Sequence, residues 1–215
     1  MTEPSLIATG LTYGYRAGTP VLDSLDLAIP AGTLTALTGR SGRGKSTLLY
    51  LLAGLLTPWR GTVTLHGRDL AAGPDRSTAR RRARHIGFVF QDAVLDARRT
   101  VLDAILEPTL YAGVDRRAYA GHALDLMREL DVDLPPGSLP GQVSGGQAQR
   151  IGVCRALLLA PDAVFADEPT GNLDAATGDA VLSALERRAA AGCTVVVATH
   201  DDRVVARCPH RIHLS

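Results

Sequence analysis

The chain has 215 residues and a mass of 22.6 kDa, which suits one domain with room for an inserted subdomain. A hydrophobic content of 46% is enough for a large core and excludes an intrinsically disordered chain. The formal net charge of +1 lacks the basic excess typical of nucleic-acid-binding proteins, so no nucleic-acid partner is expected.

The chain shows no targeting or membrane-spanning segment. Residues 1–4 carry a negative charge and no long apolar run follows them, so a signal peptide is not predicted. The most apolar stretch, residues 48–56, is far shorter than the ~20 residues needed to span a bilayer. Cys154, Cys193 and Cys208 are odd in number and widely spaced, which favours reduced thiols in a packed core. These features predict a soluble, intracellular protein.

The first 91 residues predict mainly β-structure around one helix. Apolar residues recur at helical spacing from Leu48 to Leu55, and this helix should end before Pro58. The arginine cluster at 80–84 is interpreted as a solvated helix face or a partner contact. Alternating or continuously apolar runs predict strands over residues 5–13, 21–29, 34–38, 61–67 and 86–90.

A mostly helical insertion follows. Two helical patterns cover residues 101–111 and 116–130, and prolines and glycines between 135 and 141 then break the chain. Ser144 is predicted to cap a long helix that runs through Leu159, because its side chain can accept hydrogen bonds from first-turn N–H groups.

Strand and helix alternate in the remainder of the chain, as in a parallel sheet. Residues 163–166 predict a strand that ends at Asp167, and residues 194–198 predict a second, very apolar strand. Between them, Asp174 should open a helix that stops near Gly192.

One glycine-rich stretch predicts a loop that binds a nucleoside triphosphate. A glycine, four residues and then Gly-Lys-Ser stand between a predicted strand and a predicted helix, so that backbone N–H groups and the helix N-terminus can bind phosphate. Lys45, the only lysine beside 22 arginines, would contact the β- and γ-phosphates, and the Ser46 hydroxyl suits Mg²⁺. The predicted phosphate-binding residues are Gly39, Arg40, Ser41, Gly42, Arg43, Gly44, Lys45, Ser46 and Thr47.

Polar side chains also follow other predicted strands. Asp167 can anchor Mg²⁺ through water, and Glu168 can polarise an attacking water. His200 ends the next strand and could donate to a γ-phosphate. Gln91 ends a third strand and offers a neutral amide to Mg²⁺ or to the attacking water. We expect these groups and the glycine-rich loop to meet at one edge of the sheet.

A second anion site is predicted at residues 144–147. A serine cap followed by Gly145 and Gly146 leaves a helix N-terminus unobstructed. A mononucleotide-binding core needs only one such site for its phosphates. The second site is therefore expected to serve the nucleotide of another copy of the chain.

In this order of motifs the chain resembles an ATP-binding cassette (ABC) ATPase, the nucleotide-binding subunit of a transporter, over essentially all 215 residues. The most specific match is Ser144-Gly145-Gly146-Gln147, the family signature, which other P-loop proteins lack. The other matches are the P-loop (39–47), the Q-loop residue Gln91, the Walker B strand (164–168), the D-loop (172–174) and the switch histidine His200.

The resemblance implies an α/β fold class. A P-loop NTPase (RecA-like) core would carry an N-terminal antiparallel β subdomain and an inserted α-helical subdomain. The core would comprise residues 1–91 and 151–215, and the helical subdomain about 92–150.

The resemblance also implies roles for individual residues. Two copies would bind ATP and Mg²⁺ head to tail, with Glu168 as catalytic base, His200 as γ-phosphate sensor and Asp174 as a contact across the dimer. In this family an aromatic residue before the second strand usually stacks on adenine. Tyr15 fits best by its distance from the second strand, with Tyr13 as the alternative, and either could equally be a packed edge residue.

The run from Asp167 to Asp174 is similar to the subgroup that serves lipoprotein release, macrolide or peptide export, and cell division. In that subgroup a separate integral-membrane permease is the partner. This implies an export-type ATPase, cytoplasmic and peripheral on the inner face of a bacterial plasma membrane. The tip of the helical insertion and the stretch after Gln91 would form the groove for the permease's cytoplasmic helix.

The chain departs from the family pattern in places. Val143 replaces a leucine, Arg43 adds charge to the P-loop, and residues 92–99 lack the apolar residues common after the Q-loop. Since few residues follow His200, the customary closing hairpin is not expected here. Two other functions stay open: an ATP-dependent regulatory clamp on a cell-wall or division partner, and a soluble ABC protein of translation or DNA repair. The latter usually has tandem cassettes or coiled-coil insertions, which this sequence lacks.

Overall fold

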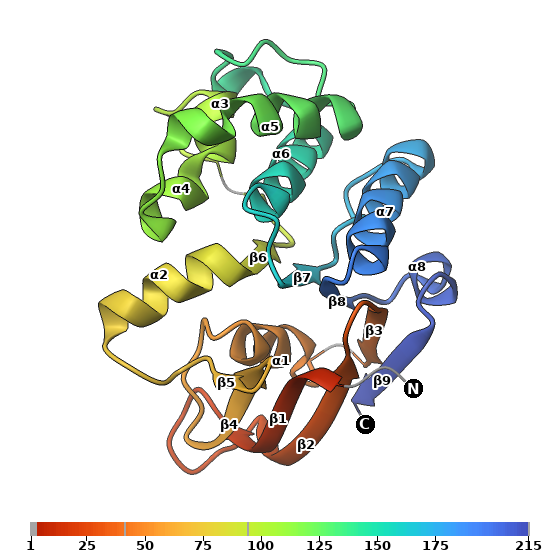
Figure 1. Cartoon of the computed structure of the whole chain (residues 1–215). Coiled ribbons are helices and arrows are strands. Elements are labelled where there is room, and N and C mark those ends of the chain that lie inside the picture. The colour runs from red at the N-terminus through yellow and green to blue at the C-terminus, as the bar shows by residue number, and fades with distance from the viewer. Residues whose placement is uncertain (1–3, 41, 94, 215) are drawn as a thin grey trace.

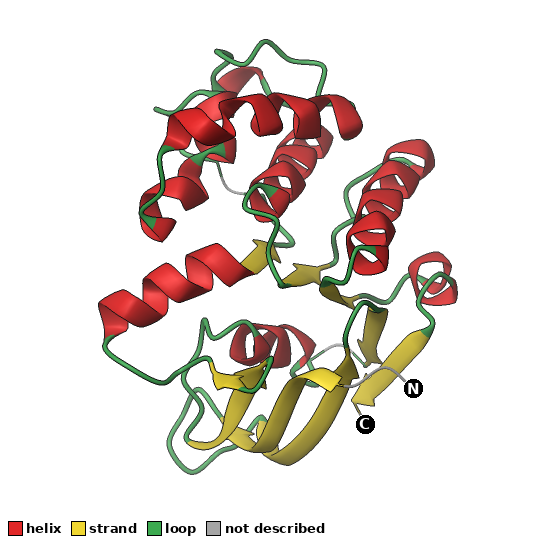
Figure 2. Ribbon diagram, in the orientation of Figure 1, coloured by secondary structure: helices red, strands yellow, loops and turns green. Residues whose placement is uncertain are grey.

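The computed structural model describes residues 4–40, 42–93 and 95–214, with both β-sheets in one lobe and a group of helices in the other (Figures 1 and 2). The first sheet is antiparallel with the strand order β2-β1-β4-β5, which confirms the predicted N-terminal β part. Its strands are β1 (Pro4–Tyr13), β2 (Leu22–Pro30), β4 (Arg60–Leu65) and β5 (Arg68–Asp69).

The second sheet has five parallel strands in the order β6-β7-β8-β3-β9. All but the last were predicted, and the sequence analysis assigned no element to residues 210–214. That final strand pairs with β3 and so lies beside the strand that leads into the glycine-rich loop. The strands are β3 (Leu34–Gly39), β6 (Ile86–Val89), β7 (Ala163–Asp167), β8 (Thr194–Ala198) and β9 (His210–Leu214).

Each face of the parallel sheet packs into a different hydrophobic core, because successive residues of a strand point to opposite faces. Phe165 of β7 packs with α1 (Lys45–Leu52) and with residues of the antiparallel sheet. Val164, its neighbour in β7, packs instead with α6 (Gly145–Leu157) and α7 (Ala175–Ala190). Helices α1 and α6 therefore lie on opposite faces of the parallel sheet.

The other lobe is helical, as predicted, but one predicted helix is divided. The pattern over 101–111 predicted a single helix, whereas the chain forms α3 (Val101–Ile105) and α4 (Glu107–Ala112), with Leu106 between them. Pro108 explains the break, because it has no N–H to continue the hydrogen-bond ladder of α3. The lobe is completed by α5 (Arg116–Glu129), the short 3₁₀ helix at Pro140–Gln142, and α6.

Helix α6 belongs to both parts of the molecule. It packs on α3 and α5 in the helical lobe and on β6 of the sheet. The proposed boundary at residue 150 falls inside this helix, so the division of the chain into core and helical subdomain stays a prediction.

The remaining helices are α2 (Asp75–His85) and α8 (Asp202–Ala206). Within the described residues, no helix is long and apolar enough to cross a membrane. Cys154 is fully buried, which raises the pKa of its thiol to about 12. Cys193 and Cys208 pack against the same core as half-buried free thiols.

Gly87 in β6 shows how closely α6 approaches the sheet. A Cβ at this position would collide with the backbone oxygen of Ala156 and lie 3.2 Å from Cγ of Pro161. We expect Gly87→Ala to lower the free energy of unfolding by at least about 2 kcal/mol, because backbone rather than a flexible side chain must move. Denaturant unfolding measures this change.

Gly121→Ala is the matched control for Gly87→Ala. Gly121 is an exposed residue of α5, and nothing lies within 4 Å of the Cβ it would gain. The same substitution should raise stability there by about 0.5–1 kcal/mol, through helix propensity alone. Equal effects at the two positions would contradict the close approach of α6 to β6.

Candidate nucleotide-binding and catalytic site

The glycine-rich loop connects β3 to α1, and its glycines adopt conformations that other residues avoid. Gly44, the N-cap of α1, has φ +87° and offers no side-chain acceptor, so the first-turn N–H groups of α1 have no side-chain cap at that position. At Gly39, φ is +145° and an added Cβ would press against the backbone oxygen of Leu214 in β9. The loop therefore presents a helix N-terminus suited to anions.

Lys45 is the first residue of α1 and folds back over the loop. Its Nζ donates to the backbone oxygens of Gly39, at 2.9 Å, and Arg40, at 3.4 Å. Arg40, Gly42 and Arg43 are exposed around it. Ser41, also predicted to bind phosphate, lies outside the described residues. The ammonium group is thus held over the part of the loop where phosphates are expected.

The strand order brings the predicted polar groups to one edge of the sheet. β6, β7, β8 and β3 are consecutive and parallel, so their carboxyl ends lie side by side. Gln91 follows β6, Glu168 follows β7, and His200 lies just beyond β8. The glycine-rich loop follows β3. Sequence spacing could not show that β8 lies between β7 and β3.

Glu168 is held in place by two neighbours. Its Oε2 accepts a hydrogen bond from Oγ1 of Thr199 at 3.0 Å, and its Oε1 accepts one from Nδ1 of His200 at 2.6 Å. Its backbone has φ +45°, a left-handed conformation that costs a non-glycine residue about 1–2 kcal/mol. The Glu168 N–H nevertheless remains bonded to the Ala198 oxygen at 2.9 Å. The strained turn aims the carboxylate across the sheet edge toward β8.

Two residues of this edge escaped the sequence analysis. Thr199 is fully buried, and only its position directly before His200 at a strand end could have suggested it. Gln149 of α6 is 1% exposed, and its Nε2 donates to the backbone oxygen of Phe90 at 3.0 Å. Gln149 thus connects α6 to Phe90, the residue before Gln91. Gln91 itself is exposed.

Glu168 raises the pKa of His200, chiefly through their hydrogen bond and then through its charge. The pair stabilises the fold most below the ordinary histidine pKa of about 6.5, and this contribution is lost as pH rises through the raised value. We expect Glu168→Gln to lower the pKa of His200, which an NMR titration of the imidazole would measure. Glu129→Gln, on α5, should leave it unchanged. An unaltered His200 pKa in Glu168→Gln would contradict the pairing.

Asp167 is 4% exposed at the end of β7. Burial is the main cause that raises the pKa of its carboxyl group, and a hydrogen bond from Ser46 opposes this shift. A buried carboxylate beside a hydroxyl is a pair of hard oxygen donors, which is the type of ligand that Mg²⁺ takes. The two residues fit this ion.

Tyr15 lies against the start of α1. Its hydroxyl hydrogen-bonds Oγ1 of Thr47 at 3.1 Å, and the residue is 64% exposed. Tyr13 is half-buried, with its ring between Tyr15 and Trp59. This geometry favours Tyr15 over Tyr13 as the residue with a free aromatic face beside the P-loop.

Ser144 caps α6, as predicted, through a reciprocal pair of hydrogen bonds. Its Oγ accepts from the N–H of Gln147 at 3.2 Å, and Oε1 of Gln147 accepts from the N–H of Ser144 at 2.9 Å. A Cβ on Gly146 would lie 3.4 Å from Leu173, so this helix end lies beside the D-loop segment. It does not face α1, which is on the other side of the sheet.

Asp174 is the N-cap of α7, again as predicted. Its carboxylate accepts from the N–H of Thr177 at 3.0 Å and from the Thr177 hydroxyl at 2.8 Å. The bond to the N–H is the main cause that lowers the pKa of Asp174. Within one chain this side chain serves the helix, and a contact across a dimer stays a prediction.

A family model described as ABC transporter matches residues 22–171, which is more than two thirds of the chain. The chain belongs to the ABC transporter family. Membership confirms the resemblance drawn from the motifs. The protein is thus the ATP-binding, ATP-hydrolysing component of an ABC transporter.

Some curated relatives of this ABC protein are about as long as this chain, and others are about three times as long. It is 38% identical to the lipoprotein-releasing system ATP-binding protein LolD of Ruegeria pomeroyi, over all of this chain and 96% of that protein. The LolD protein of Anaeromyxobacter dehalogenans is 42% identical, with 92% of its length covered. The macrolide export ATP-binding/permease protein MacB 1/2 of Paracoccus denitrificans is also 42% identical, but the chain spans only 32% of that longer protein.

Solved ABC cassettes share the fold. The dimeric structure of MJ0796, a bacterial ABC transporter cassette, superposes with a TM-score of 0.89 at 30% identity, covering 97% of this chain and 94% of that one. A post-hydrolysis state of the same cassette, bound to ADP and Pi, has a TM-score of 0.86 at 31% identity, covering 98% and 94%. These likenesses confirm the α/β P-loop ATPase fold class.

The ABC cassette also has a groove away from the P-loop, between α2, β6, α4 and α6. It has a volume of about 340 Å³, and its walls are mainly apolar. We call it the α2–α4 groove. Its lining includes Leu55, Phe88, Phe90, Pro108 and Tyr111, together with Glu107 and Arg155.

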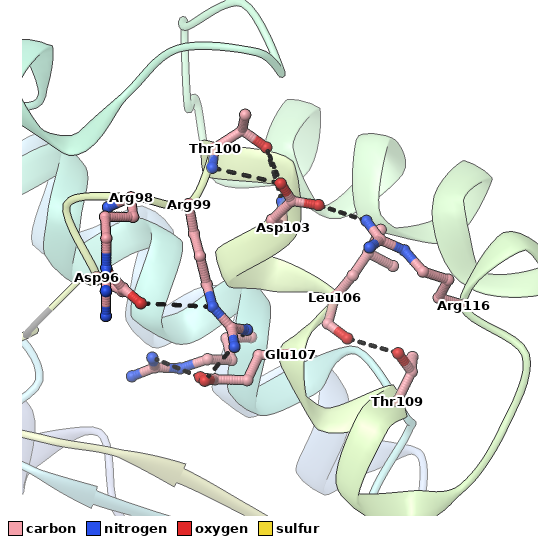
Figure 3. Close-up of polar contacts among 10 residues, drawn as sticks. Asp96, Arg98, Arg99, Thr100, Asp103, Leu106, Glu107, Thr109 and Arg116 are labelled. Carbon is pink, nitrogen blue, oxygen red and sulfur yellow. Dashed lines mark hydrogen bonds and ion pairs between the residues drawn. The ribbon is translucent and has the colours of Figure 1, made fainter.

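Glu107 joins the elements around this groove. It pairs with Arg155 of α6 at 3.4 Å and with Arg99, which follows the Q-loop, at 3.6 Å. Arg99 in turn pairs with Asp96 at 3.6 Å, so the stretch after Gln91 is tied to α4 by charge (Figure 3). Leu95 of the same stretch packs against the core, so an apolar contact and ion pairs together hold the segment after Gln91.

Proposed function

We propose that two copies of the chain bind two ATP molecules head to tail, each site combining one P-loop with the other copy's Ser144–Gln147. The observation that carries this proposal is the placement of α1 and α6 on opposite faces of the parallel sheet. In one chain the second anion-binding helix end has no phosphate to serve. The related MJ0796 cassette structures, which are dimeric, support the same arrangement.

Within each site, different residues bind the phosphates, the adenine, the metal ion and the attacking water. The N–H groups of the P-loop and Nζ of Lys45 bind phosphate, and Tyr15 stacks on adenine. Ser46, Asp167 and Gln91 would hold Mg²⁺, which neutralises phosphate charge when bound. Glu168, oriented by Thr199, accepts a proton from the attacking water. His200 is 81% exposed in its side chain, so it can turn from Glu168 to a γ-phosphate.

The α2–α4 groove is proposed as the site for a cytoplasmic helix of a separate membrane permease. Phe90, one of its lining residues, directly precedes Gln91, and the Gln149 side chain donates a hydrogen bond to the Phe90 backbone oxygen. A helix seated there would therefore sense movements of the Q-loop. Closure of the two copies on ATP and opening after hydrolysis would move the permease.

The relatives named for lipoprotein release and macrolide export support an export-type transporter. Their bacterial sources support a bacterial protein. The proposed location is the cytoplasm, at the inner face of the plasma membrane. The partners proposed are a second copy and the permease, with no nucleic acid.

The test is a pull-down of tagged Glu168→Gln protein from detergent-solubilised membranes with ATP present. This variant should hold the closed dimer on its permease, so one polytopic membrane protein should be recovered. Lys45→Ala, whose affinity for ATP should be about 10- to 100-fold weaker, is the matched control at an ATP concentration that does not saturate it. Recovery of a partner without a translocation path would favour the regulatory clamp. Recovery of the chain alone would contradict the permease part of the proposal.

A further inference from the structure

Helix α2 carries five arginines, and they divide into two groups. Arg81 donates to the backbone oxygens of Asp69 and Ala72, and Arg82 donates to that of Gly54 at 3.0 Å. These two fasten the helix to the sheet lobe. The other three, Arg76, Arg80 and Arg84, are spaced four residues apart and are all exposed. We call these three the arginine ridge.

The ridge has no ion-pair partner in the part of the chain that the structure describes, whereas Arg99, Arg155 and Arg207 elsewhere all have acidic partners. Like charges four residues apart on a helix repel each other. Arg76 also lies in the first turn, where the helix dipole disfavours a cation. Arg84 lies in the last turn, where the dipole favours a cation, so the unfavourable contributions come from Arg76 and from repulsion between neighbouring ridge residues.

Exposed apolar side chains lie next to the ridge. Helix α2 packs beside α4 (Figure 1). On α4, Leu110 is 57% exposed and Tyr111 is 61% exposed. The guanidinium group of Arg80 reaches the end of α4, where a Cβ on Gly113 would lie 3.1 Å from its Nε. Three exposed cations of α2 and an exposed aliphatic and aromatic residue of α4 thus lie on two helices that pack together.

The ridge also adjoins the α2–α4 groove. Ala79 and Ala83, one residue away from ridge positions on the helix, line that groove together with Tyr111. If the groove receives a helix of a membrane protein, as in the proposed function on which this step rests, the surface at its rim faces the bilayer. Arginine with tyrosine and leucine is a composition suited to the headgroup region of a membrane.

We propose that the arginine ridge, with Leu110 and Tyr111, binds the anionic phospholipid surface of the membrane. The bound chemistry is the phosphate of acidic lipid headgroups, with the two apolar side chains at the level of the headgroups. A nucleic acid fits the surface less well, because the ridge has only three cations and the chain has a net charge of +1.

The experiment is flotation of the purified full-length chain with vesicles. We expect binding to vesicles of phosphatidylcholine mixed with phosphatidylglycerol, but not to phosphatidylcholine alone. Added salt should weaken binding, because surface charge interactions are screened. Inorganic phosphate at matched ionic strength should not compete, which separates a lipid surface from a site for free phosphate.

The test variant is R76A/R80A/R84A, which should bind the anionic vesicles at least about tenfold more weakly. Its control is R60A/R117A/R211A, which removes three exposed arginines on β4, α5 and β9 and lowers the net charge equally. The control should bind as the unaltered chain does. Both variants should keep basal ATP hydrolysis, which shows that they are folded.

Equal binding by R76A/R80A/R84A and the unaltered chain would overturn the proposal, as would equal losses in both variants. If the ridge variant kept vesicle binding but lost the permease in detergent, the partner would be an acidic protein segment and the lipid proposal would be wrong. Since the vesicle assay contains no permease, its failure is distinct from failure of the permease proposal, which the pull-down reports.

Discussion

Replacing Glu168 with glutamine should reduce ATP turnover about 10³-fold while ATP binding is retained. The amide has the size of the carboxylate and can still accept the bond from Thr199, but it cannot take a proton from water. Glu168 lies outside the P-loop, so the phosphate-binding groups are unchanged. Single-turnover hydrolysis and equilibrium nucleotide binding, measured on the same preparation, would separate the two effects.

The control for this substitution is Glu129→Gln. Glu129 is also held by neighbours, as it pairs with Arg187 at 2.7 Å and Arg188 at 3.8 Å, but it lies on α5 away from the sheet edge. Its replacement should leave turnover unchanged. Turnover in Glu168→Gln within a few fold of the unaltered protein would remove Glu168 as the base.

The same variant should also accumulate as an ATP-bound dimer. Hydrolysis opens the proposed dimer, so a variant that binds ATP without cleaving it has no route to the open state. Size-exclusion chromatography with and without ATP measures the shift from monomer to dimer. A monomer at saturating ATP would contradict the shared-site arrangement while leaving the P-loop assignment intact.

Lys45→Ala should weaken ATP binding about 10- to 100-fold, the loss expected for charge-assisted hydrogen bonds worth about 1.5–3 kcal/mol. The ammonium group already lies over the loop through its bonds to Gly39 and Arg40. Lys45→Arg should not restore affinity, because a planar guanidinium is wider than the site that an ammonium occupies. Nucleotide titration of the three proteins measures the differences, and unchanged affinity in Lys45→Ala would contradict the P-loop assignment.

Because Lys45 is the only lysine, its side chain can be followed chemically. An amine-directed reagent has one side-chain target in this chain, apart from the N-terminal amine. ATP should protect that target, and Glu168→Gln should be protected equally. An equal rate of Lys45 labelling with and without ATP would show that Nζ does not contact the nucleotide.

Local features were predictable because nearby residues determine them. Ser144 and Asp174 were predicted as helix caps from one side chain and the turn that follows, and both caps formed. The P-loop likewise depends on glycines whose φ values other residues rarely adopt. The division of the predicted 101–111 helix is an exception, because the helical apolar spacing continues past Pro108 while the backbone hydrogen bonding does not.

The sequence alone was sufficient for the motifs, the α/β class and the ATPase family, because spacing and residue type along the chain carry that chemistry. The tertiary structure decided the rest. It set the strand order that makes β8 the neighbour of β7 and β3, and it added the fifth strand β9. It also brought the Thr199 hydroxyl within hydrogen-bond distance of the Glu168 carboxylate. It also placed α1 and α6 on opposite faces of one sheet. These features depend on pairing between segments distant in sequence, and such pairing leaves no local pattern from which it could be inferred.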